Sequence, residues 1–390
     1  MNRALLGLAF WLGLPSTALL QKYFGLAGVA AYLLGLVLAL LLWPRFGRHL
    51  PWPGAAFLEK QFPWLALLTC AALLGLFALA YPITNNGRTG DRRTSGSDTD
   101  DALNLATTEL LHGRYPYYPR TYLDNPITPM PGALLLAIPF VLLGNSAYQS
   151  FFWLLLWLLA MRRHWQAGRP PLLLLWLMLA LSPVVVYSLV VGNDYLANSL
   201  YVLLFMLWLV RWAPRPGLNP WLKLLPAICL GIGLSSRANF LLLLPLIFAT
   251  LAQLAGRPAA LRSTVTTGLT FLLVTLPFYL YDPAGFSPLH TTDELGRFNH
   301  LLPYAGLLIP LATALLALFL AWRQRVGADL QQLFRSSALV LALPVLAGLA
   351  LALLAYGPAG FTFAFFGLFP LFFGATASWH SAVCPRPHLL

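Results

Sequence analysis

Charged side chains are scarce in this 390-residue chain, which has 24 Lys and Arg residues and 12 Asp and Glu residues. Only 9% of its residues are charged, against about 25% in ordinary globular proteins. Because 59% of the residues are hydrophobic, the polar surface is too small to coat a water-soluble particle of this size. The composition therefore excludes a soluble enzyme and a disordered protein.

Cysteine is almost absent as well. Cys70, Cys229 and Cys384 are the only three, and their spacing fits neither a disulfide framework nor a metal site. The net charge of +12 comes without a basic patch interleaved with aromatic residues, so we expect no nucleic-acid partner. Membrane proteins carry an excess of Lys and Arg on their cytoplasmic loops, which accounts for the charge.

Long apolar runs are what the chain has in abundance, and a membrane span needs about 20 such residues. They predict an all-α, polytopic integral membrane protein of about 12 spans (range about 10–13), with residues 1–390 forming a single transmembrane domain. Residues 1–20 could instead be a cleaved signal peptide, but the second span follows so closely that an uncleaved anchor is favoured. The predicted spans are 4–20, 23–43, 63–82, 147–161, 170–190, 195–211, 220–236, 238–255, 264–281, 303–322, 336–356 and 359–378.

Basic clusters predict the orientation of these spans. They occur at 45–60, 161–169, 211–223, 257–262 and 323–335. All of them are cytoplasmic only if the short, proline-flanked segment 132–143 is interfacial or re-entrant. The protein is then a multi-pass protein of the cell membrane with both termini in the cytoplasm, and segment 83–146 is an outer loop.

Acidic residues gather in that outer loop. On this topology ten of the twelve acids are outside, and six of them lie between residues 91 and 124: Asp91, Asp98, Asp100, Asp101, Glu109 and Asp124. A turn signal before residue 99 and a glycine at position 113 predict an amphipathic helix over about 99–112 that lies on the outer membrane surface, with three of these acids at its start.

The three aspartates at the start of that helix have two interpretations. Capping of a helix start explains one or two acids, but three within four positions repel one another, so we expect at least one of Asp98, Asp100 and Asp101 to be functional. The same run could hold Mg²⁺ or Mn²⁺ through oxygen ligands. Because a capping cluster is the plainer alternative, we assign no metal and no cofactor.

Three segments together resemble a known family. The run from Asp100 through Gly113 to Tyr117 is followed by a proline-rich stretch from Asn125 to Gly132. This pattern resembles the first outer loop of the GT-C glycosyltransferases, in the bacterial mannosyltransferase-like branch. Two weaker matches are Gly192-Asn193-Asp194-Tyr195 and the glycine-rich stretch from Gly231 to Phe240.

The resemblance implies a glycosyltransferase at the outer face. It would transfer a mannose-like sugar from a polyprenyl-phosphate donor to a glycan or lipid-linked acceptor, with an aspartate as general base. Thr99 occupies the family's usual acid position, so the base is left open among its neighbours. The candidate residues are Asp98, Asp100 and Asp101 for the base, Arg237, Arg297 and His300 for the donor phosphate, and Tyr117, Asn125 and Asp194 for substrate binding.

Each of these candidates also has a plainer interpretation. Arg237 could extend to water from a tight turn, Arg297 and His300 could belong to a solvated loop, and Asp194 could be a turn residue. Tyr117 could belong to an interfacial aromatic belt. A lipid or small-molecule transporter or flippase is the main alternative function, and a membrane scaffold is the third. The gathering of polar residues at one face favours the enzyme.

Overall fold

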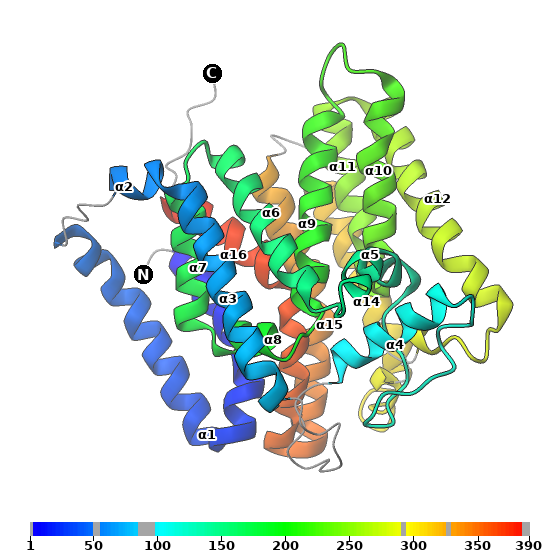
Figure 1. Ribbon diagram of the computed structural model, residues 1–390, viewed down its shortest axis with the longest axis horizontal. Coiled ribbons are helices and arrows are strands. Elements are labelled where there is room, and N and C mark those ends of the chain that lie inside the picture. Colours follow the sequence, from blue (N-terminus) through cyan, green and yellow to red (C-terminus); the bar gives the residue numbers. More distant parts are fainter. Residues whose placement is uncertain (1–2, 50–54, 85–97, 290–293, 325–328, 384–390) are drawn as a thin grey trace.

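The computed structural model of the chain describes residues 3–49, 55–84, 98–289, 294–324 and 329–383. These residues form helices joined by turns, with one isolated β-bridge between Arg120 and Pro126, which confirms the predicted all-α class (Figure 1). The α-helices are α1 (Arg3–His49), α2 (Ala55–Lys60), α3 (Phe62–Thr84), α4 (Thr99–Leu111), α5 (Pro131–Leu142), α6 (Tyr148–Trp165), α7 (Arg169–Leu181), α8 (Pro183–Val190), α9 (Tyr195–Trp212), α10 (Pro220–Leu234), α11 (Leu244–Leu254), α12 (Arg257–Tyr281), α14 (Ala305–Arg323), α15 (Leu330–Tyr356) and α16 (Leu368–Val383). The 3₁₀ helices are η2 (Ala238–Leu243), η3 (Ser287–Leu289) and η4 (Gly357–Gly367).

Several of these helices are suited to a bilayer. Within the described residues, six helices are long and apolar enough to cross a membrane, or up to seven if the bent pair α7–α8 counts as one span. Large apolar side chains such as Leu79, Leu273 and Leu307 are exposed on them. The chain is therefore a membrane protein by the length and composition of its helices, and a lipid bilayer is its environment.

The twelve predicted spans are not confirmed by this measure, and the helix breaks explain why. Predicted spans 4–20 and 23–43 both lie in α1, which is interrupted by the non-helical backbone of Gly25 (φ 65°). Two arms of α1 are visible in Figure 1. The last two predicted spans likewise fall in one helical stretch, Leu330–Ser381. Predicted spans 220–236 and 238–255 correspond to shorter apolar helices, Trp221–Leu234 and Ala238–Leu254.

A sharp bend separates α7 from α8, and polar contacts satisfy the backbone there. The two helices meet at 89°, because Pro183 has no backbone N–H with which to continue the helix. The Tyr32 hydroxyl donates to the Leu181 carbonyl at 2.7 Å, and the Ser16 and Ser182 hydroxyls are 2.9 Å apart. Broken helices are tolerated at membrane depth where neighbouring groups satisfy the freed backbone in this way.

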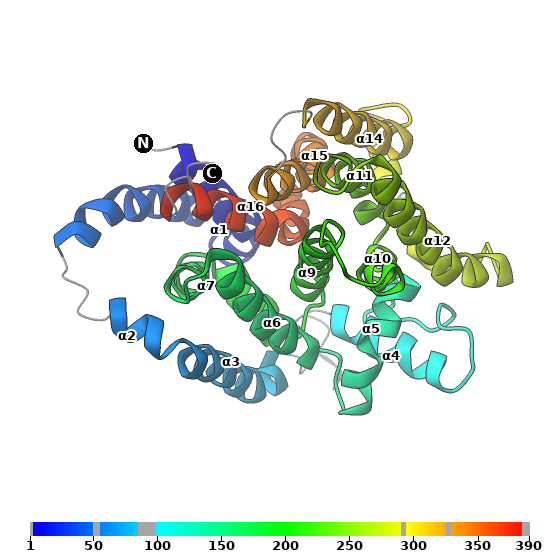
Figure 2. The ribbon, with the colours of Figure 1, turned by 90° about the horizontal axis from the view of Figure 1, so that it is seen from above.

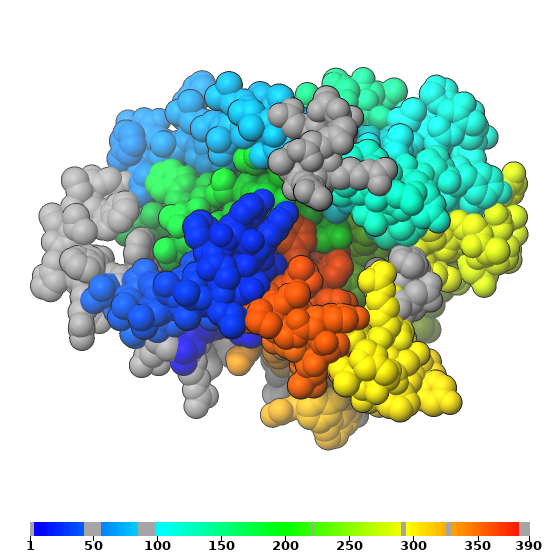
Figure 3. Space-filling view, turned by 90° about the horizontal axis from the view of Figure 1, so that it is seen from below, coloured from blue at the N-terminus to red at the C-terminus, as the bar shows by residue number. Residues whose placement is uncertain are grey.

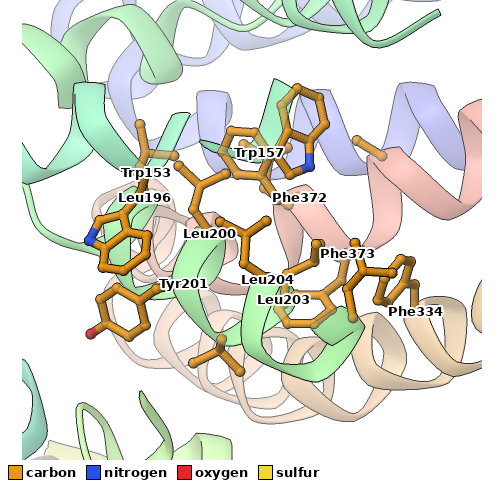
Figure 4. Packing of buried hydrophobic residues seen from close by; sticks show 14 of the residues in the cluster. Trp153, Trp157, Leu196, Leu200, Tyr201, Leu203, Leu204, Phe334, Phe372 and Phe373 are labelled. Atoms are coloured by element: carbon orange, nitrogen blue, oxygen red, sulfur yellow. The ribbon is translucent and has the colours of Figure 1, made fainter. Parts of the chain in front are cut away.

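Helix α9 forms the centre of the bundle. Its sequence is apolar on every side, as expected for a helix surrounded by others, and most of its residues are buried. Figure 2 shows α9 between α6, α10 and the α15–α16 pair. In Figure 4, Leu200 and Leu204 of α9 lie among Trp157 of α6 and Phe372 and Phe373 of α16.

The helix connections separate into two ends of the bundle. The connections α6–α7, α9–α10 and α11–α12 lie at one end, and α4, the bend of α1 and the α15–η4 turn lie at the other (Figure 1). We name the second one the α4 end and the first the opposite end. The basic clusters at 161–169, 211–223 and 257–262 thus lie at one end together, as the charge pattern predicts. Which end faces the cytoplasm stays a prediction.

Candidate functional site

Helix α4 is packed into the bundle by one apolar face. Leu103 and Ala106 are buried against α5, together with Ile127 of the following loop. The predicted polar face is not wholly solvated, because Asp100 and Thr107 are fully buried. The helix packs against neighbouring elements, whereas the sequence pattern predicted a helix lying on the membrane surface. Residues 85–97, which include Asp91, lie outside the described part of the outer loop.

Asp98 precedes α4 and faces the loop that follows the helix. It occupies the N-cap position, but its side chain makes no capping hydrogen bond. Its Oδ2 instead accepts hydrogen bonds from the Thr121 hydroxyl at 2.6 Å and the Asn125 amide at 2.8 Å. The carboxylate is half-buried, and it is close enough to interact electrostatically with the Tyr195 phenol. Capping therefore does not explain this aspartate.

Asp100 is buried between α3 and the turn before α9. Its Oδ2 accepts a hydrogen bond from the Tyr81 hydroxyl at the end of α3. Gly192 lies so close that a Cβ at this position would be 3.2 Å from the Cβ of Asp100 and 2.9 Å from that of Ala147. Gly192 also has a positive φ of 75°, which favours glycine. Asp100 thus joins α3 and α4 to the turn that carries Asp194.

Asp101 anchors the loop after α4. Its Oδ2 accepts the backbone N–H of Tyr122 at 3.0 Å. The three aspartates therefore face different partners, and the part of the chain that the structure describes contains no group of three or more His, Cys, Asp or Glu side chains able to hold a metal ion.

Arg237 and Asp194 form a buried ion pair. The Nη2 of Arg237 donates to Asp194 Oδ1 at 3.0 Å and to Oδ2 at 2.7 Å. Their side chains are only 8% and 1% exposed. The guanidinium also lies 5.0 Å from the centre of the Tyr195 ring, and Asp194 accepts the Asn198 amide at 3.1 Å. The sequence-based candidates Arg237 and Asp194 are thus brought into direct contact, one from the α10–η2 turn and one from the start of α9.

The same arginine reaches the loop that holds Asp98. Its Nη1 donates to the Thr128 hydroxyl at 3.0 Å. Backbone bonds reinforce the contact, because the N–H of Gly132 donates to the Ser235 carbonyl at 2.8 Å. A Cβ at Gly132 would collide with the carbonyl of Ile232, so only glycine permits this approach. The loop from Thr121 to Thr128 therefore joins Asp98 to Arg237.

Tyr117 lies beneath this loop among aromatic residues. It is buried, its ring is 5.0 Å from that of Phe286, and its phenol is within electrostatic reach of Arg237. Burial, with Tyr115 nearby, raises the pKa of Tyr117 well above its usual value, so the phenol stays neutral. Its hydroxyl has no hydrogen-bond partner among the described residues. Tyr117 is thus a packed, neutral residue beside the ion pair.

Arg297 and His300 lie on a separate segment. Arg297 is 60% exposed and forms an ion pair with Glu294, three residues earlier. The ring Nδ1–H of the exposed His300 donates to the Arg297 backbone carbonyl at 3.0 Å. Phe298 anchors this segment against α14 and α15. Within the described chain, neither Arg297 nor His300 makes a hydrogen bond or an ion pair with Asp98 or Arg237, so the structure does not bring them into that group.

A hollow lies at the α4 end (Figure 3). Around it are the bend of α1 in blue, α4 and its following loop in cyan, the segment after residue 293 in yellow and the α15–η4 turn in orange. At the start of α9, Tyr195 contacts Phe366 and Phe369 at centroid distances of 5.8 and 4.7 Å. Helix α4 with its following loop and the segment that carries Arg297 and His300 therefore border one hollow.

A cavity of about 530 Å³ lies between α3 and α6 at the same end. Most of its lining is apolar, and Leu74, Ala78 and Pro82 are exposed at the outer surface of α3. Tyr81 and Asn145 supply polar groups. Tyr81 donates to Asp100, and Asn145 accepts from Asn104 of α4 at 3.3 Å. Through Tyr81, the cavity on this exposed apolar surface is linked to the Asp100 carboxylate of α4.

Sequence reasoning missed several residues of this group. Thr121 and Thr128 are unremarkable loop residues in the sequence, yet they hold Asp98 and Arg237. Tyr81 resembles any interfacial tyrosine near the end of a span, and only its contact with Asp100 distinguishes it. The positions of the two threonines in the sequence do not indicate a site, because their contacts with Asp98 and Arg237 depend on how the loop folds.

The comparisons with known proteins add no relative. No protein-family model matches the chain, no curated protein matches it, and no solved structure matches its fold.

Proposed function

We propose that the protein is a membrane glycosyltransferase that moves a sugar from a polyprenyl-phosphate donor to a glycan or lipid-linked acceptor. The observation that carries this proposal is that one loop joins a half-buried carboxylate, Asp98, to Arg237, while the neighbouring Asp100 contacts Tyr81 of a mostly apolar cavity. A donor with a long apolar chain and a polar head needs an apolar surface for the chain close to polar groups for the head. The sequence resemblance to GT-C enzymes supports the same class.

Asp98 is the aspartate best suited to be the general base. The acceptor hydroxyl attacks the anomeric carbon, its proton passes to a carboxylate, and the polyprenyl phosphate leaves with the electrons of the broken C–O bond. Asp98 is oriented by Thr121 and Asn125 and is only half-buried. Asp100 is fully buried under Tyr81, and Asp101 holds a backbone amide. These two are positioning residues in this proposal.

The donor phosphate fits Arg297 and His300 better than Arg237. The Arg237 charge is already neutralised by Asp194 in a buried pair, and breaking such a pair costs about 3–5 kcal/mol. Exposed ion pairs such as Arg297–Glu294 contribute only about 0–1 kcal/mol, so Arg297 can exchange its partner for a phosphate. Arg237 then holds the Thr121–Thr128 loop in place, while Asn125 contacts both Asp98 and substrate.

The cavity between α3 and α6 is the proposed site for the lipid chain of the donor. Its apolar lining and open side suit a polyprenyl tail, and Tyr81 links it to Asp100. The bilayer is thus the source of the donor, and the outer face of the cell membrane is the proposed location of transfer.

A transporter or flippase is the second candidate. The buried Arg237–Asp194 pair and the 89° break between α7 and α8 favour it, because intramembrane charges and broken helices mark substrate pathways in transporters. Movement of lipid-linked sugar across protein-containing vesicles, without transfer to an acceptor, would support this function instead.

The test uses the purified protein in nanodiscs with labelled polyprenyl-phosphate mannose, arabinose or glucose and an acceptor pool. We expect transfer from one donor and loss of transfer in Asp98→Asn. Asp124→Asn is the matched control, because Asp124 is a 73% exposed acid of the same loop. Full activity in Asp98→Asn would refute its assignment as the base, and full activity in Asp100→Asn, Asp101→Asn and the triple variant as well would refute an aspartate base in this loop.

A further inference from the structure

A small basic cavity lies at the opposite end of the bundle, away from the candidate site. Its volume is about 100 Å³, room for roughly three waters at about 30 Å³ each. It lies where the first turns of α10 and α12 meet the end of α9. The lining residues are Ala213, Lys223, Leu224, Ala259, Arg262 and Ser263.

Helices α10 and α12 are held close together, which fixes the positions of the two cations. The Thr267 hydroxyl of α12 donates to the Ala227 carbonyl of α10 at 3.1 Å. Gly231 of α10 is so near α12 that a Cβ would be 2.6 Å from the Thr267 carbonyl oxygen. Lys223 and Arg262, one on each helix, therefore approach the cavity from two sides of a rigid contact.

Among the residues that the structure describes, no acid neutralises the positive charge of this cavity. Lys223 makes one long hydrogen bond, from Nζ to the Ala213 carbonyl at 3.4 Å, and neither Lys223 nor Arg262 has an ion pair within the described ranges. Of the acids predicted for this side, Glu59 accepts the backbone N–H groups of Gly168 and Arg169. Two cations beside a buried serine, Ser263, form a site suited to an anionic oxygen group.

The surface around the cavity is apolar and exposed. Trp221 is 79% exposed beside Lys223, and Leu222, Leu261 and Val265 are exposed on the same two helices. Exposed tryptophan and leucine next to lysine and arginine are typical of the boundary between hydrocarbon and headgroups. The cavity therefore opens at headgroup depth, with apolar flanks for acyl chains.

We propose that this cavity binds the phosphate of an anionic phospholipid headgroup, through Lys223, Arg262 and the Ser263 hydroxyl. The cavity is large enough for a phosphate and too small for an acyl chain, which lies along Leu222 and Leu261 on the apolar flank. Basic pockets between transmembrane helices recognise anionic headgroups in this way. The proposal is independent of the sugar-transfer chemistry at the α4 end.

The test measures lipid binding to the purified full-length protein. Native mass spectrometry counts bound lipids while phosphatidylglycerol or phosphatidylcholine is titrated into the detergent micelles. We expect phosphatidylglycerol to bind at least about tenfold more tightly than phosphatidylcholine, and K223Q/R262Q to lose this preference. The preference should be retained in R163Q/R335Q, which removes two exposed arginines and the same total charge. Equal losses in both double variants would overturn the site, because they would show only a dependence on net charge.

A soluble-ligand arm distinguishes the lipid from free phosphate. Glycerol phosphate and inorganic phosphate are added in place of lipid, and thermal unfolding is followed. Stabilisation by phosphatidylglycerol alone supports a lipid site. Equal stabilisation by inorganic phosphate would overturn the lipid assignment. If K223Q/R262Q does not fold, the charge-retaining K223R and the single variant R262Q take its place. K223R should keep the preference for phosphatidylglycerol over phosphatidylcholine, and R262Q should weaken it. An unchanged preference in R262Q would overturn the proposal.

Discussion

Replacing Asp194 by asparagine should destabilise the protein strongly. The substitution leaves Arg237 charged in a site where its side chain is 8% exposed and removes a partner that binds Nη2 at 2.7 and 3.0 Å. Removing one member of a buried ion pair costs about 3–5 kcal/mol. Replacing Arg237 by glutamine should cost a similar amount, because Asp194 then keeps a buried charge whose one other hydrogen-bond donor among the described residues is the Asn198 amide.

A double-mutant cycle tests the physical origin of this loss. The free energy of unfolding is measured in one detergent for Asp194→Asn, Arg237→Gln and the double variant. The double variant should lose less of this free energy than the sum of the two single losses. Contacting residues typically couple by about 0.5–3 kcal/mol, and we expect the upper part of that range. Glu294→Gln with Arg297→Gln is the matched control, since that pair is exposed and should couple by less than about 1 kcal/mol. Additive losses at Asp194 and Arg237 would refute the reasoning.

Three further predictions concern single sites. Gly192→Ala should lose about 1–3 kcal/mol of stability, because Gly192 has a positive φ and the new methyl group would meet Ala147. Gly35→Ala is the control in thermal unfolding and should not be destabilising, because a Cβ at Gly35 would have no atom within 4 Å. Tyr81→Phe should lower stability by about 1.5–3 kcal/mol through its lost hydrogen bond to a carboxylate; an unchanged melting temperature would contradict that bond. His164 lies beyond predicted span 147–161, and burial, with Arg211 and His380 nearby, lowers its pKa from 6.5 to about 4. Because the unfolded chain then binds the proton more tightly, stability should be complete above about pH 6.5 and fall toward pH 4, by about 2 kcal/mol at pH 5. The loss should be smaller in His164→Gln and unchanged in the exposed His300→Gln; equal pH profiles for wild type and His164→Gln would exclude this cause.

The helical class could be predicted from composition, but the helix breaks could not. Apolar runs are read directly from the residues, and the structure confirms an all-helical chain with several helices suited to a membrane. Whether two adjoining runs form one helix depends on a single backbone conformation such as that of Gly25. The sequence shows a glycine at that position without showing its φ.

The residue types of the candidate site were predictable, and their pairing was not. Scarce charges in apolar surroundings pointed to Asp194 and Arg237 separately. Their contact brings together positions 43 residues apart, across the α8–α9 and α10–η2 turns. Similarly, the acidic run at the start of α4 was visible in sequence, but the burial of Asp100 and the contact of Asp98 with Thr121 depend on packing between elements.

The most direct test of the proposed function is the initial rate of sugar transfer by wild type, Asp98→Asn and Asp124→Asn in the same nanodiscs. General-base catalysis typically contributes about 10²–10⁴-fold, so we predict a loss of at least about 10²-fold in kcat for Asp98→Asn, with the KM for the donor little changed. Asp124→Asn should retain the wild-type rate. Wild-type kcat in Asp98→Asn, or no transfer by the wild-type protein from any polyprenyl-phosphate sugar, would contradict the account.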